Sequence, residues 1–147
     1  MVNKRVVITG LGAITPLGTT VNDFWDKLIN GISGIGPMTL CDASNYSCRV
    51  AGEIKHFDPT NFIDAKDSKR MARFSQLAVA AGRGALMSSG LDIPFIDSFR
   101  VGVILGNGNG GFPTIELNSR ILVEKGGMKM SPFFFPMILP NMATANL

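Results

Sequence analysis

Two short apolar runs, each followed directly by glycines, limit what this chain can fold into. Residues 5–9 (RVVIT) lead into Gly10, and residues 101–105 (VGVIL) lead into the glycine-rich stretch 106–111. A continuous β-branched run of this length is typical of a strand that is buried on both faces of a sheet. The sequence therefore predicts two buried strands, each ending in a turn that is followed by a helix.

Helices and shorter strands are predicted between and after these runs. Thr20 and Asp23 have the spacing of a capping box and open a helix that ends at Asn30 and Gly31. The remaining elements, in chain order, are strands at 35–40 and 48–54, a buried helix at 74–87 that ends at Gly90, and a helix at 113–124 that ends at Gly126. Strands that alternate with helices in this way predict an α/β fold.

Composition indicates a single domain over residues 1–147, with enough apolar sequence to form a core. Hydrophobic residues make up 46% and charged residues 17%, which excludes a disordered chain and suggests a surface that is partly covered by something else. The net charge is only +3, so we expect no nucleic-acid partner. Two cysteines are too few for a disulfide framework.

The most apolar stretch, residues 132–140, is too short to span a membrane and contains three prolines. The N-terminus lacks the small-residue cleavage site that follows a signal peptide. We therefore predict no membrane span and a cytoplasmic location, or the plastid or mitochondrial matrix if the source is eukaryotic.

The stretch 106–111 matches the pattern G-x-G-x-x-G, which in nucleotide-binding folds lies between a strand and a helix. The earlier cluster after Gly10 fails this pattern, because Thr15 stands where the third glycine is needed. A dinucleotide-binding unit also needs another parallel strand after the helix, where this chain has prolines. We therefore expect no nucleotide cofactor and interpret the stretch as a turn whose main chain closely approaches a neighbour or a ligand. Binding of NAD(P) is the lesser alternative.

The sequence contains no recognisable catalytic or metal-binding constellation. His56 stands alone, and we interpret it as a loop or surface residue. Cys41 and Cys48 lack the spacing of metal ligands and have no nearby base, so we expect two buried thiols and no metal. If the protein is an enzyme, we expect its nucleophile to lie outside these residues.

Residues 66–73 hold four cations and one anion, and Lys66, Lys69 and Arg70 are among the cations. Cations at the start of a helix oppose the helix dipole. Two interpretations remain open on this pattern: a solvated helix start, and a binding surface for an anionic partner.

Several of these segments together resemble one family. The segments are residues 5–18 (RVVITGLGAITPLG), 23–25 (DFW), 32–35 (ISGI), 69–74 (KRMARF), 106–111 (GNGNGG) and 131–134 (SPFF). In order and spacing they resemble the β-ketoacyl-acyl-carrier-protein synthases, the elongating condensing enzymes of fatty acid synthesis. The similarity runs the whole length of the chain and is nearest to the type II synthase, while synthase I, polyketide ketosynthases and chain-length factors share parts of it.

The resemblance implies an α/β, thiolase-like fold of αβαβα layers, of which this chain is the front part of the N-terminal half, an incomplete segment with no second domain. It also implies a homodimer that joins acyl groups to malonyl-acyl-carrier-protein by decarboxylative Claisen condensation, without a cofactor. Cys41, Cys48 and His56 match none of the family's catalytic residues, so we expect the chain alone to be inactive, whether it is a truncated product, a fragment or one piece of a split protein. The alternative is a non-catalytic, chain-length-factor-like or polyketide ketosynthase partner subunit.

The resemblance also implies roles for individual residues. Four basic residues fall on family positions that bind the acidic acyl carrier protein: Lys66, Lys69, Arg70 and Lys129. Gly108 and Asn109 fall on the acyl pocket, with Asn109 in place of an apolar gate residue. A buried amide needs partners, so Asn109 should either bond to the backbone of the turn or face water.

Phe134 and Phe135 fall on the segment that, in the family, closes the far end of the pocket of the partner subunit. Phe135 is bulkier than the small aliphatic residue that is usual there. A larger side chain at the end of a packed pocket leaves less room for the substrate. The resemblance therefore implies a preference for medium acyl chains over the longest ones.

Overall fold

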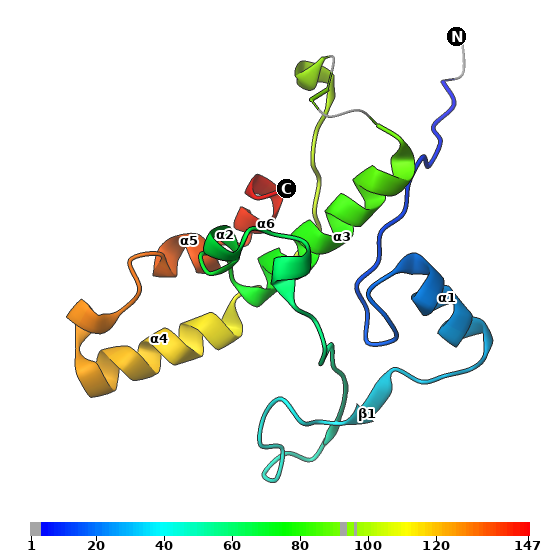
Figure 1. The fold of residues 1–147 in the computed structure, drawn as a ribbon. Coiled ribbons are helices and arrows are strands. Elements are labelled where there is room, and N and C mark those ends of the chain that lie inside the picture. The colour runs from blue at the N-terminus through cyan, green and yellow to red at the C-terminus, as the bar shows by residue number, and fades with distance from the viewer. Residues whose placement is uncertain (1–3, 92–93, 96) are drawn as a thin grey trace. The chain divides into compact units, whose positions relative to one another are not determined.

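The computed structural model of the chain describes residues 4–91, 94–95 and 97–147 (Figure 1). The chain divides into two compact units, Met1–Phe57 with Arg83–Asp92, and Asp58–Gly82 with Ile93–Leu147. The helix α3, Arg73–Ser89, contributes residues to both units. All the residues for which the sequence predicts a binding role belong to the second unit.

The first unit contains helix α1, Val21–Ile29, whose two ends follow from local chemistry. The hydroxyl of Thr20 accepts a hydrogen bond from the Asp23 backbone N–H at 3.1 Å, which satisfies one of the unpaired donors of the first turn. Gly31 follows the helix with a φ of 68°, a conformation that glycine adopts without steric cost. The predicted helix and both of its ends are confirmed.

Two short antiparallel strands follow in the first unit, β1 at Ile35–Pro37 and β2 at Val50–Gly52. Ile35 lies opposite Gly52, and Pro37 lies opposite Val50. Both predicted strands are therefore confirmed, with shorter bounds than 35–40 and 48–54, because the chain leaves the ladder at Thr39.

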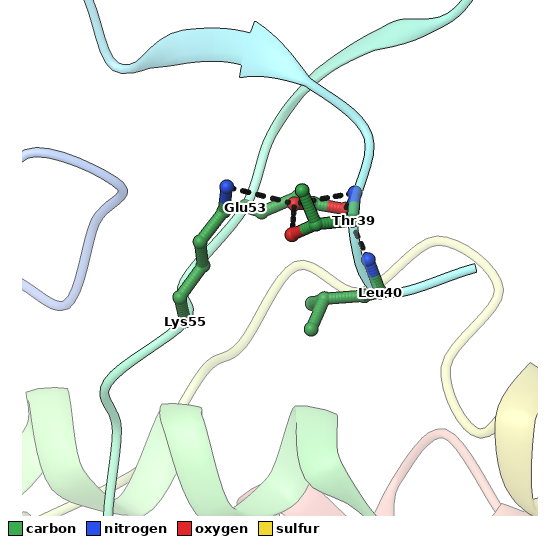
Figure 2. Close-up of polar contacts among 4 residues, drawn as sticks. All are labelled: Thr39, Leu40, Glu53 and Lys55. Atoms are coloured by element: carbon green, nitrogen blue, oxygen red, sulfur yellow. Dashed lines mark hydrogen bonds and ion pairs between the residues drawn. The ribbon is translucent and has the colours of Figure 1, made fainter. Parts of the chain in front are cut away.

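The carboxylate of Glu53 holds the chain at the point where it leaves β1 (Figure 2). It accepts hydrogen bonds from the Thr39 backbone N–H at 2.9 Å, from the Thr39 hydroxyl at 2.8 Å and from the Leu40 backbone N–H at 2.9 Å. Lys55 forms an ion pair with it at 3.4 Å, and the Glu53 side chain is only 7% exposed. The bond from the Leu40 backbone, followed by the bonds from Thr39, lowers the pKa of Glu53 from 4.5 to about 2.

The apolar run at residues 5–9 forms no strand, so the prediction of a buried strand there is wrong. Val6 is 95% exposed and Ile8 is 82% exposed. A strand requires a neighbour that takes up its backbone N–H and C=O groups, and among the described residues the only sheet is the pair β1 and β2. The run at residues 101–105 is likewise unpaired, with Ile104 at 99% exposure.

The second unit is built mainly from helices, some of them single turns. Its elements are η1 at Pro59–Asn61, α2 at Ala65–Ser68, the first part of α3, η2 at Ser98–Arg100, α4 at Phe112–Lys125, η3 at Gly127–Lys129, α5 at Phe134–Ile138 and α6 at Met142–Ala145. Helix α4 packs against α5 and η3, and α5 packs against α6. Figure 1 shows this succession running from yellow to red.

Helices α3 and α4 confirm the helices predicted at 74–87 and 113–124. Gly90 and Gly126, the residues predicted to end them, have φ values of 69° and 79°. Burial on α3 is more limited than predicted: Ser75, Val79 and Ala80 are buried, but Met87 is 85% exposed. No helix within the described ranges combines the length and the apolar character that crossing a membrane would require.

The Glu53 contact predicts a pH-dependent stability. We expect Glu53→Gln to lower the melting temperature of the chain at neutral pH, because the amide is a weaker acceptor than the carboxylate. The folded-state pKa is lowered, so the stabilisation is fully present above about pH 4.5 and is lost as the pH falls through about 2. Thermal melts from pH 7 to pH 2 should show the difference between the two proteins shrinking toward zero. The exposed Glu124→Gln in α4 is the control, and a difference for Glu53→Gln that did not depend on pH would contradict the assignment.

Candidate functional site

Three exposed cations, Lys66, Lys69 and Arg70, form a basic cluster on and directly after α2. Asp64 caps this helix, and its carboxylate accepts hydrogen bonds from the backbone N–H groups of Lys66 at 2.8 Å and Asp67 at 3.4 Å. Lys66 therefore lies in the first turn of this single-turn helix, whereas Lys69 is its C-cap residue and Arg70 follows it. The prediction of cations at helix starts holds for Lys66 in the first turn of α2 and for Arg73, the first residue of α3.

The basic cluster forms no ion pair with a described acidic residue. Among the residues that the structure describes, the ion pairs are Glu53 with Lys55 and Glu116 with Arg120. Within this described part of the chain, no ion pair therefore neutralises the charges of the cluster. Lys129, the fourth predicted cation, is exposed on η3, which lies beyond the end of α4 and away from α2 in Figure 1.

The turn that presents the cluster is held from α3 by Gln76. Its side-chain amide donates to the carbonyl oxygens of Ser68 at 2.8 Å and Met71 at 3.3 Å. Ser68 is buried, so this turn is anchored while its charged side chains stay exposed. Gln76 was not singled out from the sequence, since a glutamine inside a helical pattern carries no local signal.

The glycine-rich turn before α4 packs tightly against two helices. A Cβ atom at Gly110 would lie 2.7 Å from the ring of Phe74 in α3. Gly111 has a φ of 84°, and a Cβ atom there would lie 3.1 Å from the Cα atom of Ile138 in α5. The predicted close approach of main chain to a neighbour is confirmed at these two glycines. Gly108 differs from them, because its Cβ position has no atom within 4 Å.

The two asparagines of this turn have different surroundings. The Asn107 amide donates to the carbonyl oxygen of Pro140 at 3.3 Å, which ties the turn to the chain after α5. Asn109 is exposed and forms no hydrogen bond with any other described residue. Of the two arrangements expected for Asn109, the structure shows the one that faces water.

Phe134 and Phe135 are the first two residues of α5. Their rings meet edge to face, with centroids 5.3 Å apart and planes at 61°. Phe134 is half-buried, whereas Phe135 is 70% exposed. The exposed ring of Phe135 leaves a large apolar surface available for contact.

The start of α5 is fixed by Asn118 of α4, which was also not singled out from the sequence. Asn118 is buried, and its amide donates to the Thr114 carbonyl oxygen at 2.9 Å. Its side-chain oxygen accepts the Ser131 N–H at 3.3 Å, and the Ser131 hydroxyl accepts the Phe133 N–H at 3.2 Å. The link joins residues 13 positions apart, so no local pattern indicates it.

The remaining candidate residues do not form a reactive centre. Cys41 and Cys48 are both free and exposed, so the prediction of buried thiols is wrong: the loop between β1 and β2 lies on the surface. His56 is exposed in the segment after β2, which confirms its interpretation as a loop or surface residue. Within the described part of the chain, no group of three or more side chains is placed to hold a metal ion.

Comparison with known proteins identifies the family. A sequence profile described as "Beta-ketoacyl synthase, N-terminal domain" matches residues 3–147. The 3-oxoacyl-[acyl-carrier-protein] synthase 2 of Synechocystis is 48% identical over 141 residues, which are 96% of this chain and 34% of the relative. The synthase of the same name from Vibrio harveyi is 46% identical over 147 residues, all of this chain and 35% of the relative.

A solved structure shows the same likeness in three dimensions. It contains the ketosynthase of a type II PKS, bound to the hexaketide and in complex with its acyl-carrier protein. The match has a TM-score of 0.79 at 29% sequence identity and covers 99% of this chain and 38% of the other. This likeness confirms the predicted α/β, thiolase-like fold class.

The chain belongs to the beta-ketoacyl synthase family, whose N-terminal domain it matches. The predicted resemblance is confirmed. The chain spans about a third of the length of the curated relatives that it matches.

The packing of the glycine-rich turn leads to a stability prediction. We expect Gly111→Ala to lower the free energy of unfolding by about 1–3 kcal/mol, because a side chain is strained at this φ and meets Ile138. Gly106→Ala is the matched control, since its Cβ position is open. Urea denaturation followed by circular dichroism measures both changes. Equal effects of the two substitutions would show that the close approach is not what requires glycine.

Proposed function

We propose that this chain is part of an elongating condensing enzyme of fatty acid biosynthesis, a 3-oxoacyl-acyl-carrier-protein synthase of type II character. The observation that carries the proposal is the 48% identity with a synthase of that name over nearly the whole chain. Such an enzyme is an acyltransferase. It joins an acyl group to malonyl-acyl-carrier-protein by decarboxylative Claisen condensation and needs no cofactor.

In this reaction the acyl group first moves from its carrier thioester to an enzyme thiolate. Loss of carbon dioxide from the malonyl group then gives a carbanion, which attacks the acyl carbonyl carbon and expels the thiolate. Neither Cys41 nor Cys48 matches the nucleophile of the family. We therefore propose that the segment 1–147 contributes to substrate and carrier binding and does not supply the nucleophile. The 147-residue chain alone should therefore not decarboxylate malonyl-carrier.

The basic cluster supports a role in docking the acyl carrier protein. Its cations are exposed and have no acidic partner in the described residues, which leaves them available to an acidic protein surface. Lys129 is exposed as well, and we propose that it makes a separate contact with the carrier from η3. The related ketosynthase was solved together with its own acyl-carrier protein, which makes this partner chemically reasonable for a family member.

The glycine-rich turn and the start of α5 support a role in acyl binding. The space at Gly108 is open, so an alkyl chain can approach the main chain there. Asn109 is exposed beside it, and Phe134 and Phe135 present apolar rings from α5. We propose that these four residues contact the acyl group in the complete protein, as a homodimer in the cytoplasm or an equivalent matrix compartment.

A non-catalytic, chain-length-factor-like or polyketide partner subunit is the alternative. The matched chain of the type II PKS complex is 29% identical to this chain, against 46–48% for the two 3-oxoacyl-[acyl-carrier-protein] synthases. Sequence similarity therefore favours the synthase. A coding sequence with glutamine at the nucleophile position, and without the histidines, would favour the alternative instead.

Reversal of charge in the basic cluster tests carrier docking. In the full-length protein, Lys69→Glu with Arg70→Glu should weaken carrier binding and flatten its dependence on salt, because partly exposed ion pairs are replaced by repulsion. Each lost pair is worth about 0.2–1 kcal/mol, so the weakening should be gradual. Isothermal titration at several salt concentrations measures the effect. Lys4→Glu with Lys125→Glu makes the same change in net charge elsewhere, and equal weakening by both pairs would exclude a local docking surface.

The length of the acyl chain tests the pocket assignment. We expect Phe135→Val in the full-length enzyme to extend the longest acyl chain that is accepted, because a smaller side chain lengthens a packed pocket. Asn109→Ile should make the entrance to the same pocket more favourable for the apolar acyl chain, because it replaces an amide with an apolar side chain. Condensation assays with acyl carriers of increasing length measure both effects. An unchanged upper limit for Phe135→Val would show that this ring does not line the pocket.

A further inference from the structure

One cation of the basic cluster differs from the others in its contacts. The guanidinium carbon of Arg70 lies 4.9 Å from the centroid of the Phe133 ring. This distance is within the range of a cation–π interaction, in which the positive charge is attracted to the negative face of the ring. Among the described residues, neither Lys66 nor Lys69 makes such a contact with a ring. Arg70 thus connects the charged surface to the start of α5.

The ring that Arg70 covers belongs to the N-cap residue of α5. The Phe133 carbonyl oxygen accepts the first helical hydrogen bond, from the Met137 N–H at 2.9 Å. At the other end of α5, Ile138 lies against Gly111 of the glycine-rich turn. Helix α5 therefore spans the distance between the Arg70 contact and the turn assigned to the acyl group. A displacement of Phe133 is therefore transmitted to the glycine-rich turn through the short helix α5.

The Arg70 side chain can respond to an anion without leaving its place in the cluster. A guanidinium group can stack its flat face on a ring while its N–H edge binds a carboxylate in a bidentate manner. Its backbone is held by the bond from the Arg70 N–H to the Asp67 carbonyl oxygen at 2.9 Å, so an anion moves the side chain rather than the turn. Lysine has the charge but no flat face to stack.

We propose that Arg70 is a positioning residue that couples the docking of an acidic carrier to the position of Phe133 and hence of α5. The inference rests on the proposed function, because it assumes that the basic cluster binds a carrier. The coupling is small, since an exposed cation–π contact changes an equilibrium by about two- to fivefold. Because coupling is reciprocal, a ligand that displaces α5 changes carrier affinity by the same factor.

The experiment places 4-fluorophenylalanine at position 133 of the full-length protein and follows its fluorine NMR signal as unacylated acyl carrier protein is added. In the wild-type background we expect the signal to shift at saturating carrier. In Arg70→Lys we expect carrier affinity within about threefold of wild type, because the charge remains. The fluorine signal of this variant should shift less at saturation, because an ammonium group that binds a carboxylate has no flat face that can stay stacked on the ring.

Lys69→Gln is the matched control, since it removes a charge of the same cluster that does not contact the ring. It should weaken carrier binding, yet the signal should still shift once carrier is saturating. An equal shift in wild type and Arg70→Lys, or none in wild type at saturation, would overturn the coupling alone. Failure of the wild-type protein to bind carrier would overturn the proposed docking function, and the coupling with it.

Discussion

Close contact between main chain and helix is the constraint on which both units depend. In the first unit, a Cβ atom at Gly10 would lie 2.6 Å from the Ser89 nitrogen, and Leu11 exchanges two hydrogen bonds with the Ser88 hydroxyl. In the second unit, Gly110 and Gly111 meet α3 and α5. A Cβ atom at these glycines would push the main chain away from the helix that it contacts. The packing is therefore possible only because glycine has no side chain.

The second unit brings together residues that are far apart in sequence. The basic cluster is held by Gln76, and the start of α5 is held by Asn118, each through hydrogen bonds to another segment. Arg70 and Phe133 then join these two supported segments. Exposed charges and exposed rings on anchored backbone are suited to binding, because their positions are fixed before a partner arrives.

Much of the local structure and the family could be predicted from the sequence. Thr20, Gly31 and Gly126 mark helix ends because a cap or a left-handed glycine acts on its own backbone within a few residues. The binding roles of the cations and phenylalanines were inferred only through the resemblance to that family. The roles of these residues remain predictions.

The sequence by itself determined helices α1, α3 and α4 with their C-terminal ends, the short strand pair and the membership in the family. Only the tertiary structure decided that residues 5–9 and 101–105 stay unpaired, that Cys41 and Cys48 are exposed, and that Arg70 covers Phe133. The physical reason is the range of the interactions. A helix cap or a glycine turn forms its contacts within a few residues. A buried strand or a cation–π contact requires a second, distant segment, and no local sequence pattern specifies where that segment will lie.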